Sequence, residues 1–270
     1  MGDEHKISGK GYSLERFKFK VDNKSTKGII LAGGSGTRLH PITQVVSKQL
    51  LPIYNKPMIF YPLSLLIHAG IKDILIITTP TDKILFERLL NDGKDWGIKI
   101  DYAIQESPEG IAQAFIIANE WLDNSNSILI LGDNIFHGPN LFGIITDAIK
   151  KNNGATIFGI EVDSPEQFGV INFDDDFNVL SIEEKPEQPK SKMIATGLYI
   201  YNQEAPFLAS NLTKSMRGEY EITDLNNLYL EKNELKVVIL NNKYSWLDTG
   251  THDSLLEASN FVKKNKINTL

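Results

Sequence analysis

Residues 28–53 read GIILAGGSGTRLHPITQVVSKQLLPI, an apolar run followed by a glycine-rich turn and then by basic residues. The apolar run predicts a buried strand. Gly33, Gly34 and Gly36 follow it, and glycine costs backbone entropy without adding packing surface. Such a turn lets a phosphate approach backbone N–H groups in the positive field of a helix N-terminus, and Arg38 adds a fixed charge. On the glycine spacing alone, a tight structural turn is an equally good interpretation.

The segments after this turn alternate between helical and strand patterns. Helical patterns cover residues 57–70, about 82–90 and 111–122, and strand patterns cover 73–79, 98–105 and 127–132. This order predicts an α/β fold with a mostly parallel sheet covered by helices on both faces. A helix from residue 140 to about 151 comes next, and a closing helix begins at Thr251. Shorter strands predict a mixed sheet that extends the first one, at 155–162, 169–174, 179–184 and 195–201.

Composition excludes several classes of protein. The 270 residues carry a net charge of -6 and show no basic run, which argues against a nucleic-acid partner. The chain has no cysteine, which excludes disulfides, thiolate metal sites and a cysteine nucleophile and fits a cytoplasmic location. No segment has the roughly 20 apolar residues that cross a bilayer, so no membrane partner is expected.

Domain organisation is simple on this evidence. Residues 28–270 are expected to form a single domain, because no linker or repeat divides them. Residues 1–27 are a polar N-terminal extension in which Phe17, Phe19 and Val21 alternate with charged residues. That pattern leaves open a frayed arm or a short edge strand.

Eight motifs carry a family resemblance. In chain order they are GGSGTRLHPIT, SKQLLPIYNKPMI, QESPEGIAQA, LGDNIF, EEKP, ATGLY, RGEYEITD and WLDTGTH. From about Gly28 to Lys263 the chain resembles the sugar nucleotidyltransferases, most closely the group that joins dTTP to glucose 1-phosphate. The resemblance implies a Rossmann-like sheet and in-line attack of a sugar 1-phosphate oxygen on the α-phosphorus, which gives dTDP-glucose and expels pyrophosphate. The phosphate is already nucleophilic, so charge neutralisation and alignment do most of the catalysis.

The resemblance also implies roles for individual residues. It implies four catalytic residues, namely Arg38, Lys48, Asp133 and Lys185. It implies nucleotide-binding residues, with Gln105 on the pyrimidine edge, namely Gly33, Gly34, Gly36, Thr37, Gln49, Gln105 and Gly110. It implies sugar-phosphate-binding residues, namely Gly169, Glu184, Lys185, Thr196, Gly197, Arg217 and Glu219. It implies Asp133 and Asp248 as ligands of the cofactor Mg²⁺.

The residues taken without the family leave simpler interpretations open. Asp133 follows the strand at 127–132, at the strand end where open α/β sheets bind ligands, and its carboxylate suits Mg²⁺. An aspartate after a strand is also a common turn former. Arg38 and Lys48 have the alternative of surface salt bridges, and Gln105 that of a solvated amide. Glu184 beside Lys185 is also typical of a solvated charged pair.

Three other functions remain as alternatives. The first is transfer of a uridylyl group from UTP to glucose 1-phosphate, since one methyl group discriminates by only about 1–3 kcal/mol. The second is a non-catalytic regulatory protein that binds a sugar nucleotide. The third is a nicotinamide dehydrogenase, but this sequence has Leu39 at the position of the third glycine in the GxGxxG motif of such enzymes.

Assembly and feedback give further expectations. Longer relatives continue past the WLDTGTH helix into C-terminal helices that build subunit contacts and a second nucleotide site. This chain ends at Leu270. We therefore expect a homo-oligomer, a dimer or a tetramer, that is smaller than the family's tetramer or packed differently from it, and catalysis without feedback by dTDP-rhamnose.

Overall fold

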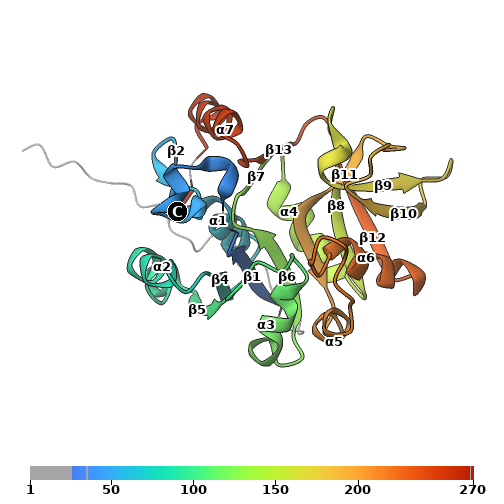
Figure 1. The fold of residues 1–270 in the computed structure, drawn as a ribbon, viewed down its shortest axis with the longest axis horizontal. Coiled ribbons are helices and arrows are strands. Elements are labelled where there is room, and N and C mark those ends of the chain that lie inside the picture. Colours follow the sequence, from blue (N-terminus) through green and yellow to red (C-terminus); the bar gives the residue numbers. More distant parts are fainter. Residues whose placement is uncertain (1–25, 35, 268) are drawn as a thin grey trace, which may run out of the picture.

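The computed structural model describes residues 26–34, 36–267 and 269–270 (Figure 1). Over these residues the chain forms a nine-stranded sheet and two small two-stranded sheets. The edge strand considered at Phe17, Phe19 and Val21 lies outside the described residues. None of the helices in the described ranges is long and apolar enough to cross a membrane.

One half of the large sheet is parallel, as the sequence predicts. Its four strands are β1 (Thr26–Ala32), β4 (Asp73–Thr78), β5 (Lys99–Ile104) and β6 (Asn126–Leu131). They lie in the order β6-β1-β4-β5, and every neighbouring pair is parallel. Successive side chains of a strand point to opposite faces, so Ile29 and Ile30 of β1 enter two different core clusters. Both faces of this half are therefore buried, which explains its nearly continuous apolar strands.

The other half of the sheet is mixed, which confirms the predicted extension. Its strands are β8 (Ala155–Glu161), β9 (Gly169–Phe173), β10 (Val179–Glu184), β11 (Met193–Tyr201) and β12 (Leu235–Leu240). Strand β11 joins the halves, because it pairs antiparallel with β6, β8 and β9. Strand β12, which the sequence analysis missed, pairs parallel with β8.

Helices cover both faces of the sheet, as predicted (Figure 1). One face is covered by α1 (Phe60–His68), α2 (Lys83–Leu90) and α4 (Leu141–Lys151), and the other by α3 (Gln113–Leu122), α5 (Ala205–Ser210) and α6 (Ile222–Glu231). Leu66 and Ile145 represent the first face, and Phe115 and Leu225 the second. Each helix buries apolar side chains against the sheet, so the site can form only where the sheet's strands end.

Small elements complete the strand-end side of the sheet. They are the pair β2 (Pro52–Ile53) and β3 (Lys56–Pro57), the pair β7 (Asn134–His137) and β13 (Ser245–Asp248), and α7 (His252–Asn265). The predicted cap at Thr251 is confirmed, because its side chain accepts a hydrogen bond from the Ser254 N–H in a capping box. Helix α7 packs on β2 through a third core cluster that contains Ala258 and Val262.

The turn after β1 differs from the expectation of a helix N-terminus. It leads into a 3₁₀ turn of three residues, η2 (Thr37–Leu39). Similar short turns are η3 (Ile42–Gln44), η4 (Lys48–Leu50), η5 (Lys94–Trp96) and η6 (Pro165–Gln167). Pro41 explains the early end of η2, because a proline forces the preceding residue into extended backbone, and His40 has ψ 145°. A helix dipole therefore contributes little here, and positive charge must come from side chains.

Candidate active site

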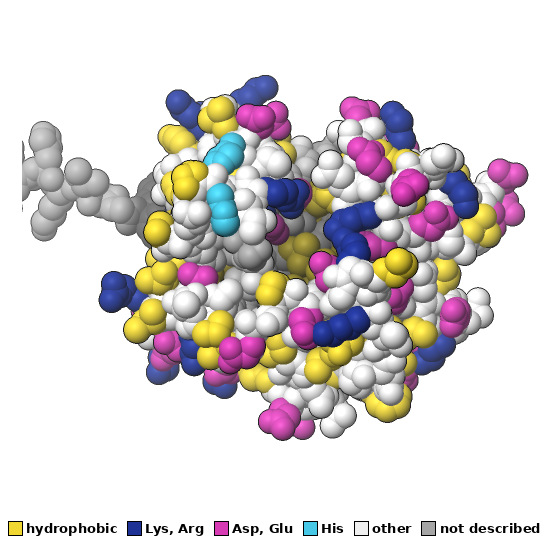
Figure 2. All heavy atoms as spheres, viewed as in Figure 1, with side chains coloured by type: hydrophobic (Ala, Val, Ile, Leu, Met, Phe, Trp, Pro, Cys, Tyr) yellow, Lys and Arg dark blue, Asp and Glu magenta, His cyan; other side chains and the backbone are white. Residues whose placement is uncertain are grey.

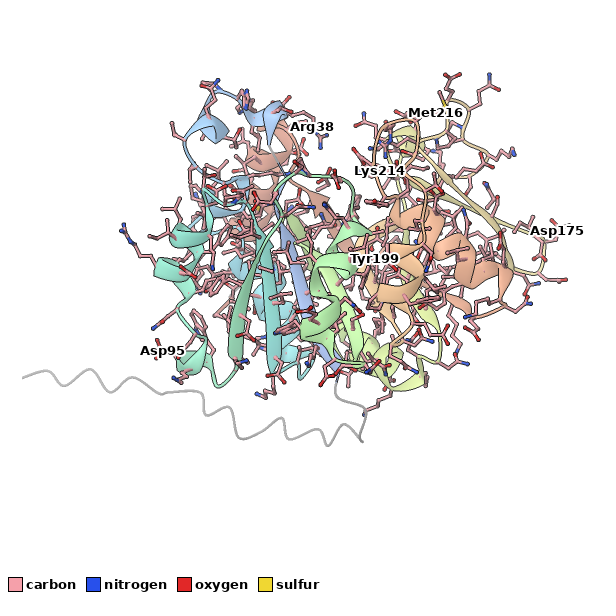
Figure 3. The ribbon with its side chains drawn as sticks, turned by 60° about the horizontal axis from the view of Figure 1, so that its bottom comes forward. Arg38, Asp95, Asp175, Tyr199, Lys214 and Met216 are labelled. Carbon is pink, nitrogen blue, oxygen red and sulfur yellow. The ribbon has the colours of Figure 1, made fainter. Side chains whose placement is uncertain are left out.

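The candidate site lies at the carboxyl ends of the parallel strands. Gly33 follows β1, Gln105 follows β5 and Asp133 lies two residues beyond β6. Open α/β sheets bind ligands at this edge. The face seen in Figure 2 is hollowed near its centre, with basic side chains on both sides of the hollow. Figure 3 shows Arg38 at the same end of the molecule as Lys214.

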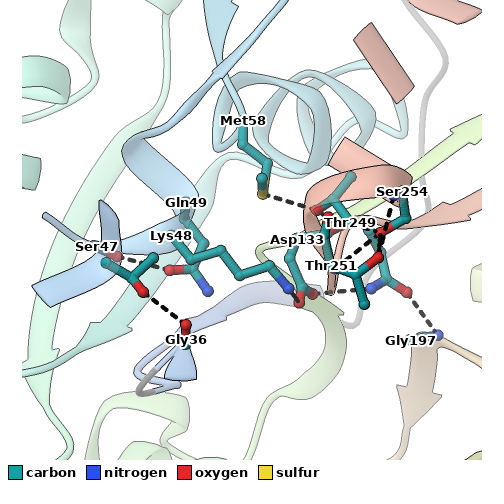
Figure 4. Close-up of polar contacts among 12 residues, drawn as sticks. Gly36, Ser47, Lys48, Gln49, Met58, Asp133, Gly197, Thr249, Thr251 and Ser254 are labelled. Atoms are coloured by element: carbon teal, nitrogen blue, oxygen red, sulfur yellow. Dashed lines mark hydrogen bonds and ion pairs between the residues drawn. The ribbon is translucent and has the colours of Figure 1, made fainter. Parts of the chain in front are cut away.

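The centre of the site is an ion pair between Lys48 and Asp133. Lys48 Nζ lies 2.5 Å from Asp133 Oδ2, and the two side chains are 7% and 20% exposed (Figure 4). Asn134 Nδ2 donates a hydrogen bond of 2.9 Å to the other carboxylate oxygen of Asp133. A lysine this buried is rarely found without a partner. The alternative of a surface salt bridge for Lys48 is therefore wrong.

Asp248 is brought beside Asp133 by the pairing of β13 with β7. In that pairing Asp248 lies opposite Asn134. The next residue, Thr249, donates its hydroxyl to the Asp133 carbonyl at 2.9 Å. Burial first, and then the negative charge of Asp133, raise the pKa of Asp248, while Lys48, among other cations, opposes the shift. Two carboxylates are thus held together against their repulsion, which a bound divalent cation relieves.

These two carboxylates fit the requirements of a divalent-cation site. Mg²⁺ is usually bound by one or two carboxylates together with substrate phosphates. In the part of the chain that the structure describes, no group of three or more His, Cys, Asp or Glu side chains could hold a metal. A metal held by Asp133 and Asp248 would therefore need further oxygen ligands from outside this pair of carboxylates.

The three glycines after β1 have different roles. A Cβ on Gly33 would collide with Gln105 Oε1, so this glycine allows a close approach. Gly36 has φ 60°, a left-handed conformation that favours glycine. Gly34 is exposed with open space beside it, so its backbone is accessible to a ligand.

The residues of η2 stand at the rim of the site. Thr37 and Arg38 are both exposed. The Arg38 guanidinium lies against Gly250, since a Cβ there would be 2.9 Å from Nη2. Arg38 also lowers the pKa of Asp248, although burial outweighs it. Arg38 thus belongs to the same electrostatic cluster as the carboxylates.

The predicted nucleotide side chains are buried amides. Gln105 is 3% exposed, and its backbone N–H donates to the Thr78 carbonyl at 2.8 Å. The alternative of a solvated amide is therefore wrong for Gln105. Gln49 is also buried, and its Oε1 accepts a hydrogen bond of 2.7 Å from Ser47. Gly110 has φ 100°, and its backbone approaches Tyr220 so closely that a Cβ would collide with it.

Two of the residues predicted to bind the sugar phosphate, Gly169 and Glu184, lie on β9 and β10. Glu184 is paired with Gly169 in the sheet, and its carboxylate accepts hydrogen bonds from Thr223 Oγ1 at 2.5 Å and Arg217 Nη2 at 3.2 Å. The Lys185 Nζ lies 3.8 Å from Glu184, and Lys185 also lowers the pKa of Asp248 against its burial. Lys185 is thus part of the electrostatic surroundings of Asp248, and Glu184 has fixed partners besides Lys185.

Several predicted sugar residues make contacts inside the protein. Arg217 Nη2 donates to Glu221 at 2.7 Å and to Glu219 at 3.3 Å. The Thr196 hydroxyl donates to the Phe158 carbonyl at 2.9 Å. The Gly197 N–H donates to Asn134 Oδ1 at 3.1 Å, which Figure 4 shows beside the Lys48 ion pair. These donors are engaged in hydrogen bonds to other protein groups, and their direct contact with a sugar stays a prediction.

Four supporting residues were missed at the level of sequence. They are Gln113, Asn134, Glu221 and Thr249. Asn134 Oδ1 accepts from Trp246 Nε1 at 2.7 Å in addition to Gly197, so it ties β7, β11 and β13 together. All four lie inside the quoted motifs, and that was the available signal. Asn134 and Thr249 have partners far away in the chain, whereas Gln113 and Glu221 bond to residues only four to eight positions away.

Residues 27–265 match the profile of the family described as nucleotidyl transferase, and the chain belongs to this family. Its curated relatives bear a more specific name. Glucose-1-phosphate thymidylyltransferase of Neisseria gonorrhoeae is 59% identical over 237 residues, which are 88% of this chain and 82% of the relative. The protein of the same name from Xanthomonas campestris is 55% identical over 88% of this chain and 80% of the relative.

Solved structures agree with this placement. A Bacillus anthracis protein assigned as a glucose-1-phosphate thymidylyltransferase, solved with a sucrose, is 38% identical, with a TM-score of 0.83. The alignment covers 91% of this chain and 97% of that one. A UDP-glucose pyrophosphorylase with UDP-glucose is 24% identical with a TM-score of 0.77, covering 89% of this chain and 99% of that one, and supports the fold alone. Nucleotidyltransferases of this type generally use a divalent metal, which the paired carboxylates fit.

Proposed function

We propose that this protein transfers a thymidylyl group from dTTP to glucose 1-phosphate, giving dTDP-glucose and pyrophosphate. The observation that carries this proposal is the cluster of Lys48, Asp133 and Asp248, which lies between the glycine turn after β1 and the EEKP segment of β10. The names of the curated relatives support the choice of both substrates.

The chemistry needs little beyond alignment and positive charge. An oxygen of the sugar phosphate bonds to the α-phosphorus, and the bond from that phosphorus to the α–β bridging oxygen breaks, so pyrophosphate leaves with the electron pair. The attacking phosphate is already anionic, so no general base is required. Lys48, Arg38 and Lys185 supply positive charge near the reacting centre, where negative charge accumulates.

We further propose that the metal is Mg²⁺, held by Asp133 and Asp248. When bound, such an ion neutralises phosphate charge and orients the phosphate oxygens. The supporting observation is the raised pKa of Asp248, since burial and the neighbouring carboxylate disfavour its charged form until a cation is near. Asn134 bonds to the Asp133 carboxylate, and Thr249, the residue after Asp248, bonds to the Asp133 backbone carbonyl.

The roles of the remaining predicted residues follow from position. We propose that the exposed backbone at Gly34 and the side chain of Arg38 contact the triphosphate, and that Gln105 contacts the base. Glu184 is available to sugar hydroxyl groups, because Thr223 and Arg217 fix its orientation. The sugar phosphate would then lie near Lys185, on the side of the cluster that faces β10.

A pyrophosphate-release assay tests this proposal. The protein is incubated with Mg²⁺, glucose 1-phosphate and, in turn, dTTP, UTP, ATP, CTP or GTP. Release is expected with dTTP above all others and only when the sugar phosphate is present. Asp248→Asn should lose most of this activity, whereas Asp253→Asn, an exposed carboxylate five residues further on, serves as the matched control. Absence of release with every triphosphate rules out the enzyme, and preference for UTP rules out the thymidylyl assignment.

Assembly and location complete the proposal. We propose a homo-oligomer, supported by exposed apolar side chains that are available for subunit contacts, namely Val45, Tyr54 and Leu256. Light scattering on a sizing column gives the mass in solution and decides this point. We propose the cytoplasm as its location, since both substrates are intracellular phosphates.

A further inference from the structure

The amide of Gln105 is held by a second amide that the catalytic scheme does not use. Gln105 Nε2 donates a hydrogen bond of 2.6 Å to Gln113 Oε1. Gln113 is the first residue of α3 and is itself fastened twice to Glu109. Its Oε1 accepts from the Glu109 backbone N–H at 3.0 Å, and its Nε2 donates to Glu109 Oε2 at 3.1 Å.

These contacts fix which end of each amide is which. A backbone N–H can only donate, and an ionised carboxylate can only accept. Gln113 must therefore present Oε1 to the Glu109 N–H and Nε2 to the Glu109 carboxylate. Gln105 must in turn present Nε2 to Gln113, because the opposite orientation would set two acceptor oxygens 2.6 Å apart. The Gln105 oxygen then faces Gly33, where no side chain intervenes.

Glu109 is anchored from the sugar side of the molecule. Lys214 Nζ lies 2.6 Å from Glu109 Oε1, and the Tyr220 N–H donates to the Glu109 carbonyl at 2.7 Å. The Lys214 ammonium also lies over the Tyr220 ring at 5.1 Å. Lys214 and Tyr220 therefore fix the position of Glu109. Glu109 hydrogen-bonds to Gln113, and Gln113 hydrogen-bonds to Gln105. The polarity of the Lys214, Glu109 and backbone groups is fixed, and it determines the orientation of both amides.

We infer that Gln113 is a positioning residue that locks the amide orientation of Gln105 and thereby makes the site select bases with an N3–H group over cytosine. The inference rests on the proposed function, because it takes Gln105 to face the base. Thymine and uracil offer an N3–H donor flanked by carbonyl acceptors. Cytosine offers an acceptor at N3 and a donor amino group at C4.

A locked amide matches only the first pattern. Gln105 Oε1 accepts from N3–H, and the second hydrogen of Nε2 is free for a carbonyl oxygen. Among the described residues, no hydrogen bond uses Gln105 Oε1, so this acceptor is available. Cytosine would place its N3 lone pair against that oxygen. An amide free to rotate would satisfy either base, so discrimination depends on Gln113 rather than on Gln105 alone.

The test compares dTTP with dCTP, which differ only in the base. In Gln113→Leu the ratio of kcat/KM for dTTP over dCTP should fall about tenfold or more, since one mismatched buried hydrogen bond discriminates on that scale. The kcat with dTTP should stay within about threefold, because Gln113 does not touch the reacting phosphates. Gln113→Met repeats the test with another apolar side chain of similar length. Asn119→Leu, an exposed position on the same helix, is the control.

A rescue separates positioning from mere packing. In the double variant Glu109→Gln with Gln113→Glu, position 113 still accepts from Gln105 Nε2 while position 109 supplies the donor. The dTTP over dCTP ratio should recover most of its original value. An unchanged ratio in folded Gln113→Leu and Gln113→Met, or a double variant no better than Gln113→Leu, would overturn the inference.

Calorimetric binding of dTTP and dCTP to each variant distinguishes this failure from failure of the proposed function. The wild-type protein binding dTTP more tightly than dCTP, with that preference lost in Gln113→Leu, supports the lock even without turnover. Equal binding of both nucleotides by the wild-type protein overturns the lock even with normal dTTP turnover.

Discussion

Asp133→Asn removes one partner of the Lys48 ion pair while keeping the shape of the side chain. Lys48 is 7% exposed, so its ammonium would stay largely buried with no ion-paired carboxylate, and Asp248 would be the negative charge left nearby. Breaking a fully buried pair in this way costs about 3–5 kcal/mol. Asp133 is 20% exposed, so water reaches this pair and a cost of about 2–3 kcal/mol is more realistic. At roughly 2–4 °C per kcal/mol for a chain of this size, Tm should fall by roughly 5–10 °C.

The same change should remove most of the activity for a different reason. Loss of one preorganised charge contact to the transition state commonly lowers kcat by about 10²–10³. The double variant Asp133→Asn with Lys48→Met separates the two effects, because it removes the unpaired ammonium as well. Its Tm should recover toward that of the native protein, while its activity should stay low or fall further.

Thermal unfolding without ligand and pyrophosphate release with Mg²⁺ measure the two effects separately. Asp163→Asn provides the control, because that carboxylate is fully exposed and its ion pair, with Lys192 at 3.3 Å, lies in solvent. An unchanged Tm for Asp133→Asn would show that the ion pair does not stabilise the fold. A native kcat would show that Asp133 does not hold the metal.

Three further changes have definite expected outcomes. Asp248→Asn should raise the Tm of the ligand-free protein at pH 7, because a carboxylate whose pKa is raised by burial and by Asp133 destabilises the fold once it is ionised. This gain in Tm should vanish as the pH falls below about 4, where the carboxyl group is protonated in the unfolded chain as well. An unchanged or lower Tm at pH 7 would contradict this prediction. Gly110→Ala, at φ 100° and against Tyr220, should lower the free energy of unfolding in urea by about 1–3 kcal/mol and raise the KM for dTTP. Gly70→Ala, at φ 89° with open space around it, should lower the free energy of unfolding by less, and equal losses would contradict the close approach of Gly110 to Tyr220. Arg217→Ala should raise the KM for glucose 1-phosphate by about tenfold while leaving that for dTTP nearly unchanged, because Glu184 loses its orienting partner; equal changes in both would remove Arg217 from the sugar side.

Local patterns predicted the parts of the fold that local physics determines. The parallel strands could be predicted because both of their faces are buried, so their sequences are nearly continuous apolar runs such as residues 128–131. The cap at Thr251 needs only the next turn of its helix. Strand β12 was not predicted because five of its six residues are exposed or partly exposed, and α6 was not predicted because its polar residues dilute the pattern.

The sequence motifs could name candidate site residues but could not predict how these residues are arranged in space. The motifs named Asp133 and Asp248, yet their proximity depends on β13 pairing with β7 across more than a hundred residues. Burial of Lys48 and Gln105 likewise follows from tertiary packing, which no neighbouring residue reveals. The glycine pattern predicted a turn that opens toward a helix or a loop, and the short η2 follows from Pro41, which restricts the residue before it to extended backbone.

The most direct test of the central claim follows the α-phosphorus. The protein is given dTTP labelled with ³²P at the α position, together with glucose 1-phosphate and Mg²⁺, and the products are separated. The account predicts that the label appears in a sugar nucleotide that contains thymidine and glucose, with unlabelled pyrophosphate released in equal amount, and that Asp248→Asn abolishes both. Label recovered as dTMP or dTDP, or label that stays in dTTP while the sugar phosphate is consumed, would contradict it.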